Sequence, residues 1–200
     1  MILVLTVLAV SPAMLIMLTG FTRIVIVLAL TRNAMGLQGI PPNQVIAGLA
    51  FFLSIFVMAP TLTQMNKVGL QPYLHGQITI TQAYDASSAP LKTWMLKQTR
   101  KQELAMFVQE THQHIKNPQQ VSMAALIPAF ILSEIKTAFT IGFIIFIPFL
   151  IIDLIVSSSL MSMGMMMLPP TLVSLPFKIL LFVLVDGWTL VVHSLLISFH

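Results

Sequence analysis

Residues 123–163 read MAALIPAFILSEIKTAFTIGFIIFIPFLIIDLIVSSSLMSM, an apolar block of about forty residues that decides the fold class. A membrane-spanning helix needs only about 20 apolar residues, because the hydrocarbon core is about 30 Å thick. At about 1.5 Å per residue, a single helix would measure roughly 60 Å, twice that thickness. We therefore predict two membrane-embedded segments, a hairpin or a bent pair. Bends are expected at Pro128 and Pro148, since proline removes an intrahelical hydrogen bond.

The rest of the chain has the same apolar character. Of its 200 residues, 57% are hydrophobic and only 8% are charged, whereas soluble domains carry about 25% charged residues. Further apolar blocks cover residues 2–30, 45–62 and 172–199. The first block is too long for a signal-peptide core and lacks an early basic residue, so we expect a mature membrane segment there. The predicted fold is an all-α membrane protein of four to six long, bent apolar helices arranged as hairpins.

The middle of the chain is more polar. No apolar run between residues 64 and 120 is long enough to span a membrane. The sequence Ser87-Ser88-Ala89-Pro90 predicts a helix start, because proline is tolerated in the first turn. A second helix is predicted from an apolar stripe at helical spacing, formed by Leu104, Phe107, Val108, Thr111 and Ile115.

These patterns predict three regions. Residues 1–63 form a first membrane-embedded helical pair, residues 64–120 a polar, mostly helical region, and residues 121–200 a second membrane-embedded helical region. Three basic residues, Arg23, Arg32 and Lys178, share one side of a four-span arrangement. The positive-inside rule makes that side cytoplasmic, which places the middle region on the extracytoplasmic side.

Six charged residues lie in or beside the apolar blocks. They are Arg23, Glu134, Lys136, Asp153, Lys178 and Asp186. A charge at the centre of a bilayer costs about 2.5–3.5 kcal/mol, so such residues face protein or water. Glu134 and Lys136 are two positions apart and cannot face each other on a helix. Two interpretations stay open: pairing across helices or subunits, which fixes register and contacts, and a proton or ion relay.

A methionine-rich turn follows the long apolar block. Residues 161–170 read MSMGMMMLPP and contain Met161, Met163, Met165, Met166 and Met167. The glycine and the two prolines indicate a turn rather than a helix interior. Thioether side chains are flexible and fill irregular space, so ordinary packing is one interpretation. The other is a soft apolar constriction that gates a pore by excluding water.

Other classes of function find little support. The absence of cysteine excludes disulfides, thiolate metal sites and cysteine nucleophiles. His112 and His114 lie on different faces of a helix and have no third ligand nearby, so no metal site is expected. A Walker loop and the usual catalytic constellations are missing from the sequence, so we expect neither an enzyme nor a cofactor. The basic residues are too dispersed for a nucleic-acid surface.

Eight motifs, in the expected order, resemble the FliP family of flagellar biosynthetic proteins and its counterpart in injectisomes, the SctR family. They are FTRIVIV (21–27), RNAMG (32–36), PPNQV (41–45), LIPAFILSEIKTAF (126–139), IPFLIIDL (147–154), MSMGMMMLPP (161–170), LPFK (175–178) and LVDGW (184–188). The middle region carries little of the resemblance. Members of the family begin with a cleaved signal peptide, so we expect that Met1 is not the natural start.

The resemblance implies a core subunit of the flagellar type III protein-export gate, in the bacterial inner membrane at the flagellar basal body. It implies a homo-oligomer, a pentamer, that assembles with FliQ- and FliR-like subunits and other export-apparatus membrane proteins. The substrates would be unfolded flagellar proteins. In this family the methionine-rich turn is assigned to a gasket around the closed pore. The alternative is an ion or small-solute transporter in which Glu134, Lys136 and Asp153 carry protons.

Overall fold

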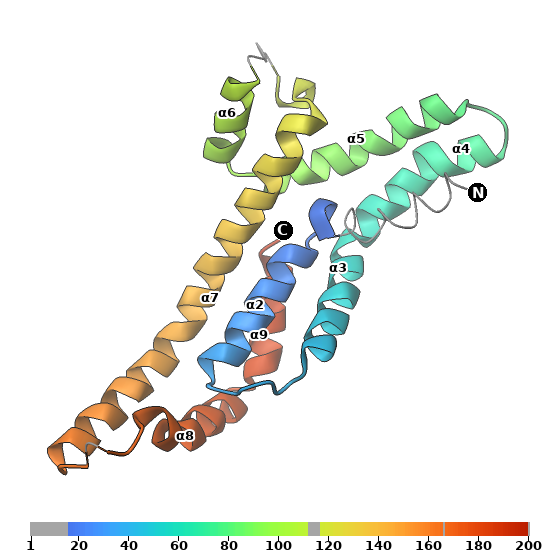
Figure 1. Ribbon diagram of the computed structural model, residues 1–200. Coiled ribbons are helices and arrows are strands. Elements are labelled where there is room, and N and C mark those ends of the chain that lie inside the picture. Colours follow the sequence, from blue (N-terminus) through green and yellow to red (C-terminus); the bar gives the residue numbers. More distant parts are fainter. Residues whose placement is uncertain (1–15, 112–116, 166, 200) are drawn as a thin grey trace, which may run out of the picture. The chain divides into compact units, whose positions relative to one another are not determined.

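Helices dominate the computed structural model, which describes residues 16–111, 117–165 and 167–199 (Figure 1). No strand occurs in these ranges, and the all-α membrane fold predicted from the sequence is confirmed. Two helical stretches, Asn43–Leu74 and Met123–Ser162, are long and apolar enough to cross a membrane. A bent pair of helices near the carboxyl end makes a third candidate if it counts as one span. Helices suit lipid because every backbone group is satisfied within its own segment.

The described chain divides into two compact units. The first holds residues 16–22 and 52–136, and the second holds residues 23–51 and 137–199. The three-part division along the sequence stays a prediction.

The first unit contains a helical hairpin, formed by the second half of α3 (Asn43–Met65), the π-helix η1 (Asn66–Leu70), α4 (Gln71–Leu74) and α5 (Ile80–Gln98). Figure 1 shows α5 returning beside α4 and η1. The two arms approach closely at Gly69. A Cβ atom there would overlap the side chain of Ser87 and lie 2.8 Å from the carbonyl oxygen of Ala83. The hairpin therefore requires a residue without a side chain at this position.

Helix α5 begins earlier than predicted. Thr79 forms a capping box, in which the Gln82 N–H donates to Thr79 Oγ1 at 3.4 Å and the Thr79 N–H donates to Gln82 Oε1 at 3.0 Å. The predicted start at residues 87–90 is wrong, and Pro90 lies inside the helix. The box satisfies two amide groups at the helix start, which favours an early beginning. A long helix tolerates the single hydrogen bond that Pro90 removes.

The core of the first unit joins α5 to the start of α7. Its buried residues are Met95, Val121, Ala125, Leu126 and Phe130. Helix α6 (Lys101–Glu110) follows α5 and packs the predicted apolar stripe against this core through Leu104, Phe107 and Val108. Ile115 of the stripe lies outside the described residues. A short 3₁₀ turn, η2 (Pro118–Gln120), precedes α7.

The longest apolar block is a single helix, α7 (Met123–Ser162), of 40 residues. The predicted division into two segments at Pro128 and Pro148 is therefore wrong. Each proline removes one intrahelical bond, and an apolar helix can accommodate such a loss by small local adjustments. At roughly 60 Å, α7 exceeds the hydrocarbon thickness, so at ordinary tilt part of it lies outside the core.

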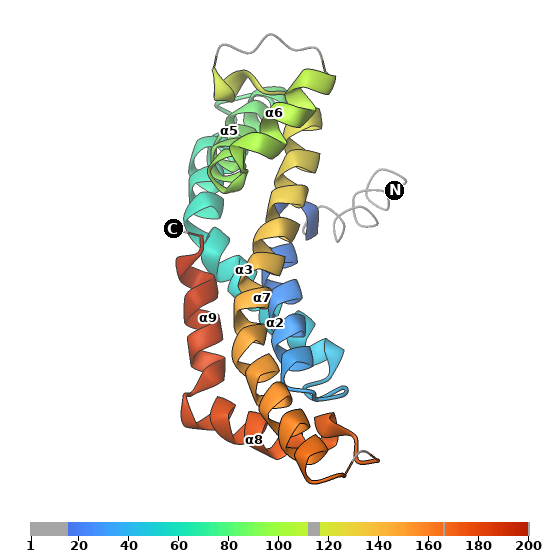
Figure 2. The same ribbon diagram turned by 90° about the vertical axis from the view of Figure 1, so that its left-hand side faces the viewer.

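The second unit contains most of α2 (Phe21–Ala34), the second half of α7, α8 (Pro170–Leu184) and α9 (Gly187–Ile197). The last predicted apolar block is interrupted, because α8 and α9 meet at a bend of 63° (Figure 2). Asp186 adopts a left-handed conformation at the bend, with φ of 51°. A Cβ atom on Gly187 would overlap the Phe182 ring, so the glycine allows this ring to cover the bend.

Helices α2 and α7 approach closely where Leu30 meets Gly142. A Cβ atom on Gly142 would overlap the tip of the Leu30 side chain and lie 3.2 Å from its Cβ. We expect Gly142→Val to destabilise the protein by about 1–3 kcal/mol, the usual cost of overpacking. The measurement is the thermal unfolding midpoint of the full chain in detergent. The matched control is Gly48→Val in α3, where an added Cβ meets no atom within 4 Å. Equal midpoints for the two variants would contradict the close contact.

Candidate pore turn and buried ion pairs

The methionine-rich segment is a defined turn between α7 and α8, and we call residues 161–168 the methionine turn. Helix α7 ends in a Schellman motif, with Gly164 at φ of 72°. The Met165 N–H donates to the Leu160 carbonyl at 3.0 Å, and the Gly164 N–H donates to the Met161 carbonyl at 3.1 Å. Pro170 then occupies the first turn of α8, where its missing N–H costs nothing.

The methionine turn exposes its apolar side chains. The exposed fractions are 61% for Met161, 73% for Met163, 45% for Met165 and 98% for Met167. Met166, the fifth predicted gasket residue, lies outside the described residues. Contiguous exposed apolar side chains indicate a surface that contacts protein, lipid or a ligand. Their role as a gasket stays a prediction.

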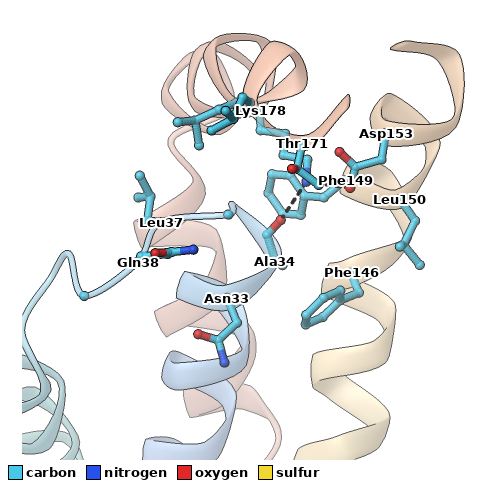
Figure 3. A pocket seen from close by; sticks show the side chains of 14 residues that line it. Asn33, Ala34, Leu37, Gln38, Phe146, Phe149, Leu150, Asp153, Thr171 and Lys178 are labelled. Atoms are coloured by element: carbon cyan, nitrogen blue, oxygen red, sulfur yellow. Dashed lines mark hydrogen bonds and ion pairs between the residues drawn. The ribbon is translucent and has the colours of Figure 1, made fainter. Parts of the chain in front are cut away.

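A partly buried ion pair joins α7 to α8 beside the end of α2 (Figure 3). Lys178 Nζ lies 2.6 Å from Asp153 Oδ2 and 3.5 Å from the carbonyl oxygen of Ala34. The Ser174 hydroxyl donates to Asp153 Oδ1 at 2.5 Å. Lys178 and Ser174 are buried. Both oxygens of the carboxylate thus have a donor, which offsets part of the cost of taking the charges out of water.

The position of this pair matters for the methionine turn. Asp153 precedes the turn by roughly two helical turns, and Lys178 follows it by roughly three. The pair therefore ties together the two helices that carry the turn. Next to it lies a pocket of about 430 Å³, whose polar lining includes Asn33, Gln38 and Thr171 (Figure 3).

A second ion pair joins α6 to α7 in the first unit. Lys136 Nζ lies 2.5 Å from Glu103 Oε1, and Glu103 is buried whereas the Lys136 side chain is half exposed. The Arg100 N–H donates to the Ser133 hydroxyl at 3.0 Å and strengthens the same contact. The hydrogen bond from Lys136 holds the pKa of the Glu103 carboxyl below its ordinary value. Glu103 was not among the sequence-predicted residues, because 33 positions separate it from its partner.

Acid should weaken the contact between α6 and α7. The folded-state pKa of Glu103 is lowered, so its contribution to stability is fully present above the ordinary value of 4.5 and disappears as the pH falls through the lowered value. We expect the gap in thermal midpoint between the wild-type chain and Glu103→Gln to be larger at pH 7 than at acidic pH. Glu110→Gln, on the exposed end of α6, is the control. A gap that does not change with pH would contradict this role.

The remaining predicted charges occupy three different environments. Arg23 is buried, donates through Nη1 to the Ser198 carbonyl at 2.7 Å and lies 4.0 Å above the Phe199 ring. It therefore ties α2 to the residues that follow α9. Glu134 is fully buried in the first unit. Asp186 is exposed at the bend between α8 and α9.

Some partners in these contacts were missed by sequence reasoning. Ser174 and Ser198 carry no pattern that distinguishes them from other helix serines. The sequence gives one weak indication of a role for Glu103. It lies in the first turn of α6, where the positive end of the helix dipole stabilises a negative charge. His112 and His114 lie outside the described residues. Among the residues that the structure describes, no group of three metal-binding side chains occurs.

Long apolar helices, two of them able to cross a membrane, define a helical integral membrane protein. The chain matches the FliP family over residues 4–195, and it belongs to this family. It is 53% identical to flagellar biosynthetic protein FliP of Bacillus subtilis, over all of the chain and 90% of the relative. Identity is 51% to FliP of Pectobacterium carotovorum, over 98% of the chain and 76% of the relative. FliP of Aquifex aeolicus is 48% identical over 98% of the chain and 83% of the relative. The family suggested by the motifs is confirmed.

Proposed function

We propose that the chain is a core subunit of the flagellar type III protein-export gate. Copies of it, as a pentamer with FliQ- and FliR-like subunits and in contact with other export-apparatus proteins, form the pore for unfolded flagellar proteins. This assembly lies in the bacterial inner membrane at the flagellar basal body. Membership of the FliP family supports the flagellar role. The observation that carries the pore role is the exposed methionine turn between two helices tied by a partly buried ion pair.

The chemistry of the methionine turn suits a gasket. Thioether side chains are flexible, and their contacts are soft and non-directional. Several copies arranged around an axis would close on one another when the pore is empty, and the apolar ring would exclude water and therefore ions. The same side chains would yield to many different unfolded sequences, because they impose no fixed shape.

The outer surface of α7 supports assembly with other subunits. Its exposed side chains in the second unit include Phe143, Ile144, Leu154 and Ile155, each more than half exposed. Such a surface needs lipid or another apolar surface against it. A ring of copies would cover part of it, as the proposed pentamer requires.

Co-expression tests the assembly. The chain, produced with the FliQ- and FliR-like subunits of its own bacterium, should purify as one complex whose native mass requires several copies of the chain. It should also restore motility to a strain that lacks its own copy, whereas the chain expressed without the partner subunits should conduct no ions. A complex with a single copy of the chain, or solute transport by the chain alone, would contradict the proposal and favour a transporter.

A further inference from the structure

The two helices of the bent pair have opposite polarity. Helix α8 buries Ser174 and Lys178, and its exposed residues after Thr171 are all apolar, Val183 among them. Its outer surface is therefore that of a helix against lipid or an apolar partner. Helix α9 has the reverse pattern, as its buried residues are Gly187, Val191 and Leu195. Its polar residues Thr189, His193 and Ser194 are exposed, as is Asp186 at its start.

The polar side chains of α9 are not satisfied within the described chain. In α7, the hydroxyls of Ser159 and Ser162 donate to carbonyls four residues earlier, as expected in apolar surroundings. The side chains of Thr189, His193 and Ser194 form no hydrogen bond with another described residue. Asp186 does not cap α9 with its carboxylate. These four exposed groups are therefore free to bind something outside the described chain.

The hydrocarbon core of a membrane cannot satisfy them. Hydrocarbon offers no hydrogen bonds, and a carboxylate placed in it is strongly disfavoured. Leu190 and Ile197 share the outer face of α9, with 53% and 58% of their surface exposed. A face that mixes hydroxyls, an imidazole, a carboxylate and two aliphatic side chains suits contact with water and with a polypeptide.

We propose that this α9 polar face (Asp186, Thr189, His193 and Ser194) lines the water-filled passage of the assembled gate and contacts the unfolded polypeptide in transit. The inference rests on the proposed function. Hydroxyl and imidazole groups exchange hydrogen bonds with any peptide backbone, so they bind many sequences without preference. Individually, such bonds gain little in exchange with water, so they hold a passing chain weakly.

The absence of cysteine allows a direct test, because every thiol in this chain is one introduced by design. Thr189→Cys and Ser194→Cys are placed singly in the complete complex in lipid vesicles and treated with a membrane-impermeant maleimide. The controls are Val191→Cys on the buried face of α9 and Val183→Cys on the outer face of α8. Native mass confirms that each variant assembles.

We expect Thr189→Cys and Ser194→Cys to react at least about tenfold faster than both controls, because apolar surroundings raise the pKa of a thiol and reduce its reactive thiolate. A substrate trapped in the pore should slow both reactions. Rates equal to those of Val183→Cys would overturn the inference, since the face would then contact lipid or another subunit. Rates unaffected by a trapped substrate would also overturn it.

A further variant separates this inference from the proposed function. Met167→Cys in the methionine turn should cross-link to the trapped substrate if the pore proposal is right. Cross-linking at Met167→Cys without protection of the α9 polar face would overturn the present inference alone. The absence of cross-linking at Met167→Cys would overturn the proposed pore, whatever the result on α9.

Discussion

Cells that carry the assembled complex with Met163, Met165 and Met167 replaced by alanine should leak small ions. The three side chains are exposed at the tip formed by α7 and α8, and their truncation would widen an apolar ring beyond the width that excludes water. Assembly should persist, because side chains this exposed contribute little to packing. The measurement is ion conductance across the membrane of cells with the intact complex. The expected effect is a change from a closed to an open pore.

Two control variants separate the effect of where the methionines lie from the effect of their side-chain chemistry. Met106 in α6 is also exposed, at 45%, and Met106→Ala should leave conductance unchanged. Replacement of the three turn methionines by leucine should keep the ring apolar and the leakage low. Unchanged conductance in the alanine variant with the complex intact would mean that the methionine turn only fills space.

Removal of one member of the Asp153–Lys178 pair should prevent assembly of a stable complex. Lys178 is buried and the pair is 2.6 Å apart, so Lys178→Ala leaves an uncompensated carboxylate. Breaking a fully buried pair costs about 3–5 kcal/mol. Because the Asp153 side chain is 26% exposed, we expect the lower end of this range, about two powers of ten in an equilibrium constant. The measurement is the yield and thermal midpoint of the purified complex. Lys101→Ala, at an exposed position of α6, is the control.

An exchange of the two charges distinguishes pairing from proton transfer. The double variant Asp153→Lys with Lys178→Asp should recover part of the assembly that each single change loses. Full recovery is not expected. In the wild-type protein the Ser174 hydroxyl donates to the carboxylate of Asp153, and the double variant loses this hydrogen bond. If Asp153→Asn assembled normally but blocked proton-dependent export, the relay interpretation would be favoured and pairing would be wrong.

Several features of the site followed from the sequence because they depend on local chemistry. The methionine turn was located by Gly164 and the following prolines, which stop a helix wherever they occur together. The fold class followed from the length and composition of the apolar blocks, since a backbone in lipid must satisfy its own hydrogen bonds and few structures do so. The predicted start of α5 at residues 87–90 was wrong, because the capping box at Thr79 stabilises an earlier start of the same helix. The breaks predicted at Pro128 and Pro148 do not occur, because the residues on both sides of each proline continue the helix.

By itself, the sequence determined that the chain is an all-α membrane protein of the FliP family with a methionine-rich turn. Composition, helix signals and motifs are properties of neighbouring residues, so they can be read along the chain. Only the tertiary structure decided that Lys136 pairs with Glu103 and Lys178 with Asp153. It also decided that α8 buries Ser174 and Lys178 while α9 exposes Thr189, His193 and Ser194. These outcomes depend on which helices pack together and at what rotation, and contacts between residues far apart in the chain set both.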